Sequence, residues 1–372
     1  MLLKIWFDIL TPKQIMFFKP VIDILKKQNN EILCTSRNYR EANELSTIKE
    51  LELLIIGNHG GADLYNKIVE STNRIKDLLK IIQNFSPDLV ISFSSPEAAR
   101  ISFGLRIDHI GFNDSPHAEA VARLSLPLLT KLFSPSLIPL SSWTKYGISP
   151  DNIIRYNGLD PVAWLMPHHN DIHHKQNKNN NSIFNKLKID QSKKSILIRL
   201  EESQAAYIHN HKLIVEPNAL VESVVKRFHS DYNVLILCRY SDQITELSKR
   251  FKNKAIVLNE VVDGISLLKN IDIFIGAGGT MTAESALLGI PTVSIAPVRF
   301  YIDDYLQKIG LIKRSFDESS LLFDVEFFLK NHNDCLLLAK KANKILREME
   351  NPLDKLLAYI NSNHMKNITP DN

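Results

Sequence analysis

The stretch Ile273-Phe274-Ile275-Gly276-Ala277-Gly278-Gly279-Thr280-Met281-Thr282-Ala283-Glu284 carries the strongest structural signal in the chain. An apolar run ends in a glycine-rich turn, and the residues after that turn have the pattern of a helix. Glycines let backbone N–H groups approach an anion, and the N-terminus of a helix favours negative charge. The stretch therefore predicts a strand, a turn and a helix that bind phosphate, with Gly278, Gly279 and Thr280 at the turn.

Glu284 falls about one turn into the predicted helix. A carboxylate at this position can accept hydrogen bonds from two hydroxyl groups of a ribose. Gly289 and Pro291 then mark the end of the helix. One alternative stays open, in which the glycines only form a tight turn and Glu284 is a solvated acid.

Outward from this stretch, apolar runs alternate with helical patterns along most of the chain. The predicted strands are Lys4–Leu10, Glu31–Thr35, Leu53–Ile56, Leu89–Phe93, His109–Phe112, Ser195–Leu200, Asn233–Cys238, Ala255–Leu258, Ile271–Gly276 and Thr292–Ala296. Alternation of this kind builds parallel sheets with helices on both faces. From about residue 317 to 363, the pattern predicts helices only.

Two of the predicted helices lead to specific expectations. In the helix that follows Thr11, Pro20 interrupts the apolar periodicity and is expected to kink or shorten the helix. In the segment Asp63–Phe85, the apolar residues share one face, whereas Arg74 and Lys76 lie on the opposite, polar face together with Lys67 and Lys80.

Composition changes abruptly between about 166 and 182, where the chain has almost no apolar residues. The histidine tract there (His168, His169, His173, His174) is interpreted as part of a solvated linker rather than a metal site. We therefore predict an α/β protein with two Rossmann-like domains that face a cleft. The expected parts are residues 1–165, a polar linker over 166–182, residues 183–345, and a terminal helix with its tail over 346–372.

The overall composition is that of an ordinary soluble globular chain of 372 residues, with 44% apolar and 23% charged residues. A formal net charge of +4 is too small for a dedicated nucleic-acid binder. The 3 cysteines are scattered, so disulfides are not expected and a cytoplasmic location is. No run is long and apolar enough to span a membrane. The apolar segment 124–140 is interpreted as core, with contact to a membrane or a lipid-linked acceptor left open.

Polar residues that follow strands are the candidates for catalysis, because ligands of open α/β sheets bind beyond the carboxyl ends of strands. His59 lies between glycines and Asn58 and can transfer protons near neutral pH. Asp114 follows another strand and can deprotonate a hydroxyl group as general base. The alternatives are a turn histidine without a role and a helix N-cap at Asp114. Asp8 and Thr11, at the end of the first strand, are expected to line the same cleft.

Arg199 and Arg239 end two strands of the second domain, and a guanidinium group suits the geometry of a phosphate. Surface arginines at strand ends are the alternative. The chain contains no D-x-D sequence, the pair with which metal-dependent sugar transferases hold a cation. We therefore expect neither a metal nor a cofactor. The motifs G-x-G-x-x-G and G-x-x-x-x-G-K-[ST] are also absent from the sequence, which removes the usual signatures of dinucleotide and P-loop sites.

The glycine-rich stretch resembles the donor-binding motif of GT-B glycosyltransferases and of non-hydrolysing UDP-N-acetylglucosamine 2-epimerases. The segments Ile5–Pro12, Gly57–Gly61, Phe112–Pro116 and Asn157–Leu159 are similar to an uncharacterised, largely archaeal family that is grouped with the GT-B proteins. This resemblance spans nearly the whole chain. One departure is Ala277, where the epimerases have a serine that contacts phosphate.

The resemblance implies that Gly278, Gly279 and Thr280 contact a diphosphate and that Glu284 contacts a ribose. It also implies that the acceptor docks on the N-terminal domain and that the last helix crosses back to that domain. The function expected is a metal-independent glycosyltransferase that uses a nucleotide-sugar donor and a sugar or lipid-linked acceptor. The alternatives are a non-hydrolysing nucleotide-sugar 2-epimerase and a non-catalytic nucleotide-sugar-binding protein.

Overall fold

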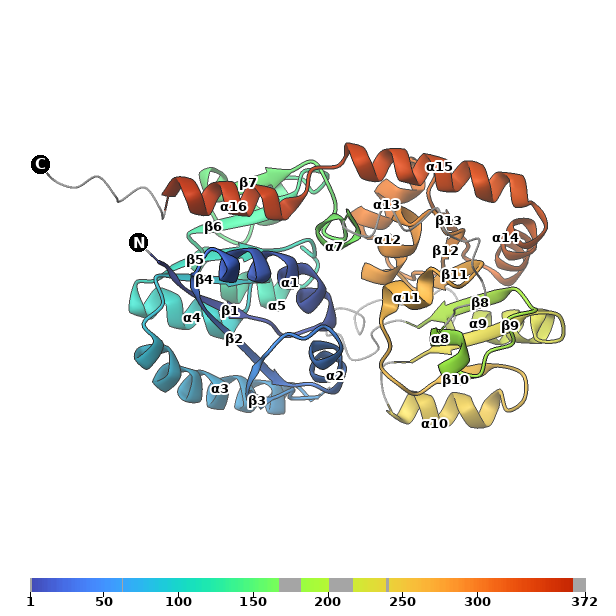
Figure 1. The fold of residues 1–372 in the computed structure, drawn as a ribbon, viewed down its shortest axis with the longest axis horizontal. Helices are drawn as coiled ribbons and strands as arrows, with labels where there is room; N and C mark the ends of the chain where they lie inside the picture. Colours follow the sequence, from blue (N-terminus) through green and yellow to red (C-terminus); the bar gives the residue numbers. More distant parts are fainter. Residues whose placement is uncertain (1, 62, 167–181, 201–216, 239–240, 364–372) are drawn as a thin grey trace, which may run out of the picture. The chain divides into compact units, whose positions relative to one another are not determined.

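A computed structural model describes residues 2–61, 63–166, 182–200, 217–238 and 241–363. The described residues form two compact units. Unit 1 contains those up to Trp164 and those from Met349 onward, and unit 2 contains those from Leu165 to Glu348. Each unit is built on one parallel sheet with helices packed around it (Figure 1).

Unit 1 contains a seven-stranded parallel sheet with the strand order β3-β2-β1-β4-β5-β6-β7. Its strands are β1 (Lys4–Asp8), β2 (Glu31–Asn38), β3 (Leu54–Asn58), β4 (Leu89–Ser92), β5 (Asp108–Phe112), β6 (Lys131–Pro135) and β7 (Ile153–Tyr156). From β1, the chain adds β2 and β3 on one side of the sheet and then β4 to β7 on the other, so the switch point lies between β1 and β4. In open α/β sheets such a switch point, at the carboxyl ends of the strands, is where ligands bind.

Alternating residues of β1 explain why helices cover both faces of this sheet. Trp6 packs into a cluster with Leu78, Ile82 and other side chains on one face. The ring of Phe7 lies on the other face, 5.4 Å from that of Phe18. The helices of unit 1 are α1 (Pro12–Lys27), α2 (Arg40–Ile48), α3 (Leu64–Phe85), α4 (Pro96–Leu105), α5 (Glu119–Ser125), α6 (Ser141–Thr144), α7 (Val162–Leu165, at the boundary) and α16 (Pro352–Asn363).

The α1 helix is not shortened at Pro20, because it continues through this residue for a total of 16 residues. Proline removes one backbone hydrogen bond from a helix. In α1 that loss is offset by a face of buried side chains, among them Phe17, Phe18 and Val21, which lie on both sides of the proline.

Unit 2 contains a six-stranded parallel sheet with the order β10-β9-β8-β11-β12-β13, which reverses direction between β8 and β11. Its strands are β8 (Ser195–Arg199), β9 (Asn233–Leu237), β10 (Ile256–Leu258), β11 (Ile273–Gly276), β12 (Thr292–Ser294) and β13 (Lys313–Arg314). Its helices are α8 (Ser182–Lys186), α9 (Pro217–Phe228), α10 (Ser241–Arg250), α11 (Gly264–Leu268), α12 (Thr280–Leu287), α13 (Tyr301–Lys308), α14 (Glu318–Lys330) and α15 (His332–Glu348). The predicted α/β class with two parallel-sheet domains is therefore confirmed.

The final helix, α16, belongs to unit 1, as expected for a chain that crosses back to its first domain. The ring of Tyr359 in α16 lies 5.9 Å from that of Phe133 in β6. Lys355 Nζ donates to the carbonyl oxygen of Arg155 at 2.8 Å. Gly158 permits the return, because a Cβ there would lie 2.3 Å from the carbonyl oxygen of Glu350.

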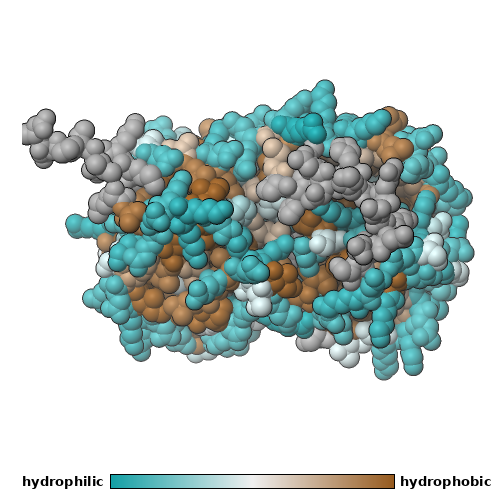
Figure 2. All heavy atoms as spheres, in the orientation of Figure 1, coloured by the Kyte–Doolittle hydropathy of each residue, from teal (hydrophilic) through white to brown (hydrophobic). Residues whose placement is uncertain are grey.

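The segment 124–140 contains a strand that the sequence pattern did not indicate. This segment supplies β6, and Leu132 and Phe133 of that strand are fully buried. The interpretation as core therefore fits these residues, although Leu124 is 61% exposed. Polar and apolar residues are mixed on the face drawn in Figure 2. None of the helices that the structure describes has the length and apolar character needed to span a membrane.

Candidate functional site

The glycine-rich turn lies at the switch point of the unit 2 sheet. Gly276, the last residue of β11, is in register with Arg199, the last residue of β8. The backbone N–H of Ala277 donates to the carbonyl oxygen of Arg199 at 3.2 Å, which ties the start of the turn to β8. The turn then passes through two left-handed residues, Gly278 with φ of +88° and Gly279 with φ of +85°, and α12 begins.

Only one of the glycines in this turn faces open space. A Cβ on Gly276 would lie 2.4 Å from Thr282 Oγ1, and one on Gly278 would lie 2.9 Å from the ring of Phe300. A Cβ on Gly279 would meet no atom of the described residues within 4 Å. The first two glycines are therefore required by packing, whereas Gly279 leaves backbone accessible beside the N-terminus of α12, where N–H groups lack intrahelical partners.

The end of α12 explains the second part of the motif. Gly289 has φ of +73°, and its N–H donates to Ala286 at 3.0 Å. The N–H of Ile290 donates to Ser285, also at 3.0 Å, which completes a Schellman cap. A Cβ on Gly289 would lie 2.6 Å from the Cα of Ala339 in α15, so this glycine holds α12 against its neighbour.

Glu284 is buried, with 8% of its surface exposed. The alternative of a solvated first-turn acid is therefore wrong, because α12 begins at Thr280 and its first turn contains no acidic residue. A buried carboxylate costs free energy unless hydrogen-bond donors surround it. The contact of Glu284 with the hydroxyl groups of a ribose stays a prediction.

The expected phosphate contacts of Arg199 and Arg239 stay predictions. Arg199 is half-buried, and its Nη1 donates to the carbonyl oxygen of Cys238 at 3.0 Å, at the end of β9. Arg239 lies outside the described residues. Arg314 was missed by the sequence reasoning: its Nη2 donates to the carbonyl oxygens of Ala296 and Val298 at 3.2 and 3.3 Å. Arg314 therefore fixes the loop after β12.

In unit 1, Asp114 belongs to a buried cluster of charges at the carboxyl ends of three strands. Lys13 Nζ lies 2.5 Å from Asp114 and 2.7 Å from Asp160, which follows β7. Asp114 Oδ1 also accepts from the Ser115 hydroxyl at 2.8 Å. Tyr156 donates to Asp160. The predicted alternative of an N-cap is wrong, because α5 begins only at Glu119.

The pKa values of the two carboxyl groups in this cluster are shifted in opposite directions. Burial raises the pKa of Asp160 to about 6, against the attraction of Lys13. Burial also acts to raise the pKa of Asp114. The charge of Lys13 and hydrogen bonds with Lys13, Ser115 and Asp160 outweigh burial and hold the pKa of Asp114 below its usual value. Asp114 is therefore ionised at neutral pH, and an incoming hydroxyl group must share it with Lys13.

His59 lies in a different part of unit 1, directly after β3. Its Nδ1 accepts from the N–H of Gly61 at 3.2 Å, and its ring stacks on Tyr39 at 5.2 Å. Burial lowers the pKa of His59 to about 4, with further contributions from the charges of Arg37 and Lys67. The ring is therefore neutral at physiological pH, with Nδ1 as acceptor and Nε2 as the protonated nitrogen.

The strand order separates the two candidate bases. His59 follows β3 and Asp114 follows β5, with β2, β1 and β4 between them. Four strand spacings amount to about 19 Å across the sheet. One reacting hydroxyl group cannot contact both residues, so His59 and Asp114 are alternatives rather than partners.

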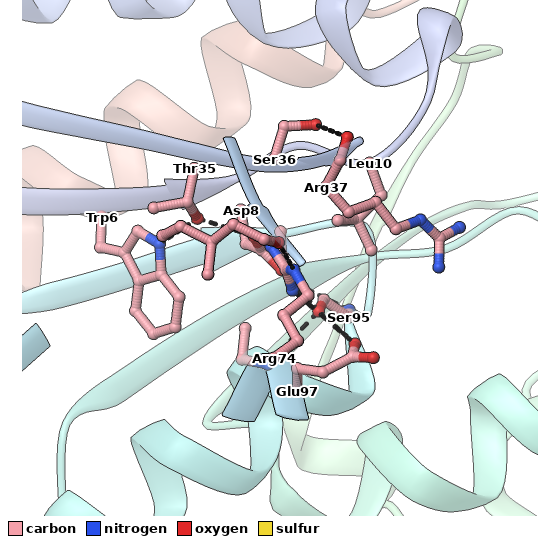
Figure 3. A network of polar contacts seen from close by, with 12 residues as sticks. Trp6, Asp8, Leu10, Thr35, Ser36, Arg37, Arg74, Ser95 and Glu97 are labelled. Carbon is pink, nitrogen blue, oxygen red and sulfur yellow. Dashed lines mark hydrogen bonds and ion pairs between the residues drawn. The ribbon is translucent and has the colours of Figure 1, made fainter. Parts of the chain in front are cut away.

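Asp8 does not line an open surface, contrary to expectation, but is fully buried. Its carboxylate binds both terminal nitrogens of Arg74, at 2.5 and 3.1 Å, and accepts hydroxyl groups from Thr35 and Ser95 (Figure 3). Arg74 is 1% exposed, so its predicted place on a solvated face is wrong. The sequence does contain an acid at the end of a strand, Asp8, and an arginine in a later helix, Arg74. Helical periodicity alone does not show that these two residues form a pair.

The described part of the chain contains no cluster of three or more His, Cys, Asp or Glu side chains able to hold a metal. The histidine tract (His168, His169, His173, His174) lies outside the described residues. Independence from metal and cofactor therefore stays a prediction.

Several solved structures share this fold over almost their whole length. S. aureus MnaA, in a structure with UDP, has a TM-score of 0.73 at 13% identity and covers 100% of this chain and 98% of its own. UDP-GlcNAc 2-epimerase of Methanocaldococcus jannaschii, solved with UDP-GlcNAc and UDP, has a TM-score of 0.66 at 16% identity, covering 96% and 99%. The spinosyn rhamnosyltransferase SpnG has a TM-score of 0.60 at 13% identity, covering 96% and 100%. The fold is thus that of GT-B glycosyltransferases and epimerases.

A closer relative is known from sequence. The uncharacterized protein MJ0665 of Methanocaldococcus jannaschii is 32% identical over 308 residues, which are 82% of this chain and 85% of that protein. The model of one protein family, described as a protein of unknown function (DUF354), matches residues 3–363. The chain therefore belongs to the DUF354 family.

Proposed function

We propose that this protein is a metal-independent glycosyltransferase that transfers a sugar from a nucleoside-diphosphate sugar to an acceptor hydroxyl group. One observation carries the proposal: the backbone at Gly279 faces open space beside the N-terminus of α12, at the switch point of the unit 2 sheet. Amides and a helix dipole at such a place stabilise the charge that develops on a departing diphosphate.

The residues around the turn supply the remaining contacts of the proposed donor site. Thr280 is half-buried at the start of α12. Its hydroxyl group would replace the serine hydroxyl that the epimerases have at the position of Ala277. Glu284 would accept the ribose hydroxyl groups from its buried position. The nucleotide-sugar is the substrate in this scheme, and the backbone amides perform the role that a cation has in metal-dependent transferases.

Asp114 is the proposed general base of unit 1. It is ionised and lies at the carboxyl end of β5, with 14% of its side chain exposed. Proton transfer to Asp114 requires the acceptor hydroxyl group to displace Lys13 from one carboxylate oxygen. Lys13 retains Asp160 as a partner during that exchange, so its charge stays compensated.

A nucleotide-sugar 2-epimerase is the second candidate, because the UDP-GlcNAc 2-epimerase of Methanocaldococcus jannaschii has a higher TM-score, 0.66, than the rhamnosyltransferase at 0.60. Incubation with UDP-N-acetylglucosamine in the absence of any acceptor separates the two functions. Formation of the 2-epimer supports the epimerase, whereas release of UDP only after an acceptor is added supports the transferase. Binding without either reaction supports a non-catalytic nucleotide-sugar-binding protein.

Calorimetric titration of UDP tests the donor site directly. In Gly279→Ala, the methyl group enters the space proposed for the diphosphate, and affinity for UDP is expected to fall at least about tenfold. Gly61→Ala is the matched control, because Gly61 has φ of +67° and equally open surroundings but lies in unit 1. Equal affinity in Gly279→Ala and wild type, or no UDP binding by the wild type at millimolar concentration, would refute the donor site.

A further inference from the structure

Arg37 occupies an irregular position near the end of β2. Its neighbours Ser36 and Asn38 pair with Ile55 and Asn58 of β3, so that two residues of β3, Ile56 and Gly57, oppose Arg37 alone. This is the geometry of a β-bulge, a feature that redirects side chains and is frequent beside functional sites. The bulge lies at the carboxyl edge of the unit 1 sheet, one strand from its switch point.

The bulge also determines which arginine receives the nearby carboxylates. Gly57 has φ of +73°, and a Cβ there would lie 3.1 Å from the side chain of Arg74. Arg74 fills this space, donates from Nε to the carbonyl oxygen of Ile56 at 3.0 Å, and forms its ion pair with Asp8. Glu97 lies 4.0 Å from Arg74 and accepts the Ser95 hydroxyl at 3.3 Å. Both carboxylates are therefore engaged without Arg37.

Among the described residues, the Arg37 side chain has no carboxylate as an ion-pair partner. Its Nε is buried and has no hydrogen-bond partner among the described residues, and none of the ion pairs within that part of the chain includes it. In Figure 3 its guanidinium group points away from Asp8 and Arg74, and no dashed line reaches its nitrogens. An arginine keeps its charge even when half-buried, so the cost of desolvation is not removed by loss of a proton.

Burial is the main influence on the charge of Arg37, and it lowers the pKa of the guanidinium group. The carboxylate of Glu97 acts to raise this pKa, more strongly than the charge of Arg74 acts to lower it, and Asp8 adds a smaller effect in the same direction as Glu97. Arg37 and Lys67 likewise lower the pKa of His59, on the adjacent strand. Neither carboxylate forms an ion pair with Arg37, so a negatively charged ligand in direct contact with the guanidinium group would offset the cost of its burial.

We propose that Arg37 binds an oxyanion, a carboxylate or phosphate group carried by a small molecule that unit 1 recognises. The planar guanidinium group fits two oxygens of either anion, and its orientation is fixed by the bulge rather than by an internal partner. Arg37 belongs to unit 1 and the donor turn to unit 2, so the two proposals rest on different residues.

Titration of the full chain with inorganic phosphate and with glucuronate, at constant ionic strength, tests the site. The wild type is expected to bind at least one of the two anions in the millimolar range, and Arg37→Gln to lose about tenfold or more in affinity. Tighter binding of phosphate assigns a phosphorylated ligand, and tighter binding of glucuronate assigns a carboxylated one. Arg40→Gln, which removes an exposed arginine paired with Glu44, is expected to bind as the wild type does.

Thermal unfolding supplies a second measurement that a purely structural role for Arg37 would not satisfy. Without anion, Arg37→Gln is expected to unfold at the same temperature as the wild type or about 2–4 °C higher, because an uncompensated charge has been removed. Added phosphate or glucuronate should then stabilise the wild type but not the variant.

Three results would overturn the proposal. They are anion binding by Arg37→Gln equal to that of the wild type, absence of saturable binding by the wild type at about 50 mM of either anion, and a clear loss of stability in the variant. UDP affinity is expected to be unchanged in Arg37→Gln. Failure of the donor site would therefore appear in the UDP titration alone, and failure of this proposal in the anion titrations alone.

Discussion

Lys13 Nζ lies 2.5 Å from Asp114 Oδ2, and this ion pair joins the start of α1 to the end of β5. The same ammonium group lies 2.7 Å from Asp160, whose side chain is fully buried. Lys13 also lies 4.9 Å from the ring centre of Phe93. One cation thus holds together three segments that are distant in sequence, and it controls the charge available to the proposed general base.

Removal of that cation is expected to destabilise unit 1. Lys13→Met leaves two buried carboxyl groups without their shared partner, so the free energy of unfolding should fall by about 2–4 kcal/mol. All 3 tryptophans, Trp6, Trp143 and Trp164, lie in unit 1, and tryptophan fluorescence during urea unfolding reports on this unit. Lys19→Met, which removes the partly exposed Lys19–Asp23 pair of the same helix, should change the free energy of unfolding by less than about 0.5 kcal/mol. Equal effects of the two substitutions would contradict the assignment.

The distance between the two candidate bases leads to a kinetic prediction. Asp114→Asn keeps the shape of the side chain but removes the base, so kcat with a given acceptor should fall about 10²–10⁴-fold. His59→Gln should retain activity within about threefold, because a neutral ring with a pKa of about 4 and a place across the sheet contributes no proton transfer there.

Steady-state measurements with donor and acceptor both varied, on variants that keep the wild-type fluorescence, check this prediction. A large loss of kcat in His59→Gln with normal activity in Asp114→Asn would reverse the assignment. Comparable large losses in both would show that the separation of β3 and β5 does not keep the two residues apart in catalysis.

The alternation of strands and helices was predictable from the sequence for most strands that are buried on both faces. Strands such as β4, β8 and β11 are short runs of apolar residues, and their positions agree with the prediction to within a few residues. The strand β6 escaped detection because Lys131 and two prolines flank its apolar residues. The strand β13 has only 2 residues, which is too short for any periodic signal.

The donor turn was predictable because its requirements are local, since glycines with positive φ and a helix N-terminus are adjacent in sequence. The charge cluster of unit 1 was not, because Lys13, Asp114 and Asp160 are brought together only by the strand order. Arg74 shows the same limit: helical periodicity assigned it to a polar face with Lys76, but the bulge at Gly57 opens a path into the core.

The different burial of Arg74 and Lys76 in α3 leads to a prediction about stability. Arg74→Met leaves Asp8 buried and unpaired, and the free energy of unfolding is expected to fall by about 3–5 kcal/mol. Lys76→Met, on an exposed position of the same helix, is expected to change it by less than about 0.5 kcal/mol. Urea unfolding followed by tryptophan fluorescence measures both, since Trp6 lies in the same core cluster as residues of α3. Similar stability of the two variants would contradict the buried pair.

Asp303 in unit 2 gives a prediction about pH. Its carboxyl group is 1% exposed and accepts the Ser294 hydroxyl at 2.9 Å, and burial raises its pKa from 3.8 to about 6. Between these two values the unfolded chain releases the proton while the folded chain keeps it. The contribution of Asp303 to stability therefore falls as the pH rises from about 4 to about 6, and it stays low above that.

Asp303→Asn keeps an oxygen for Ser294 but does not titrate. Relative to the wild type, the variant should therefore gain stability as the pH rises, by up to about 3 kcal/mol between pH 4 and pH 8. Urea unfolding by circular dichroism, compared with the tryptophan signal of unit 1, isolates the transition of unit 2. Asp77→Asn, at an exposed position, is the control and should show no such trend. A stability difference between Asp303→Asn and wild type that is constant across this pH range would mean that the Asp303 carboxyl group is ionised in the folded protein throughout.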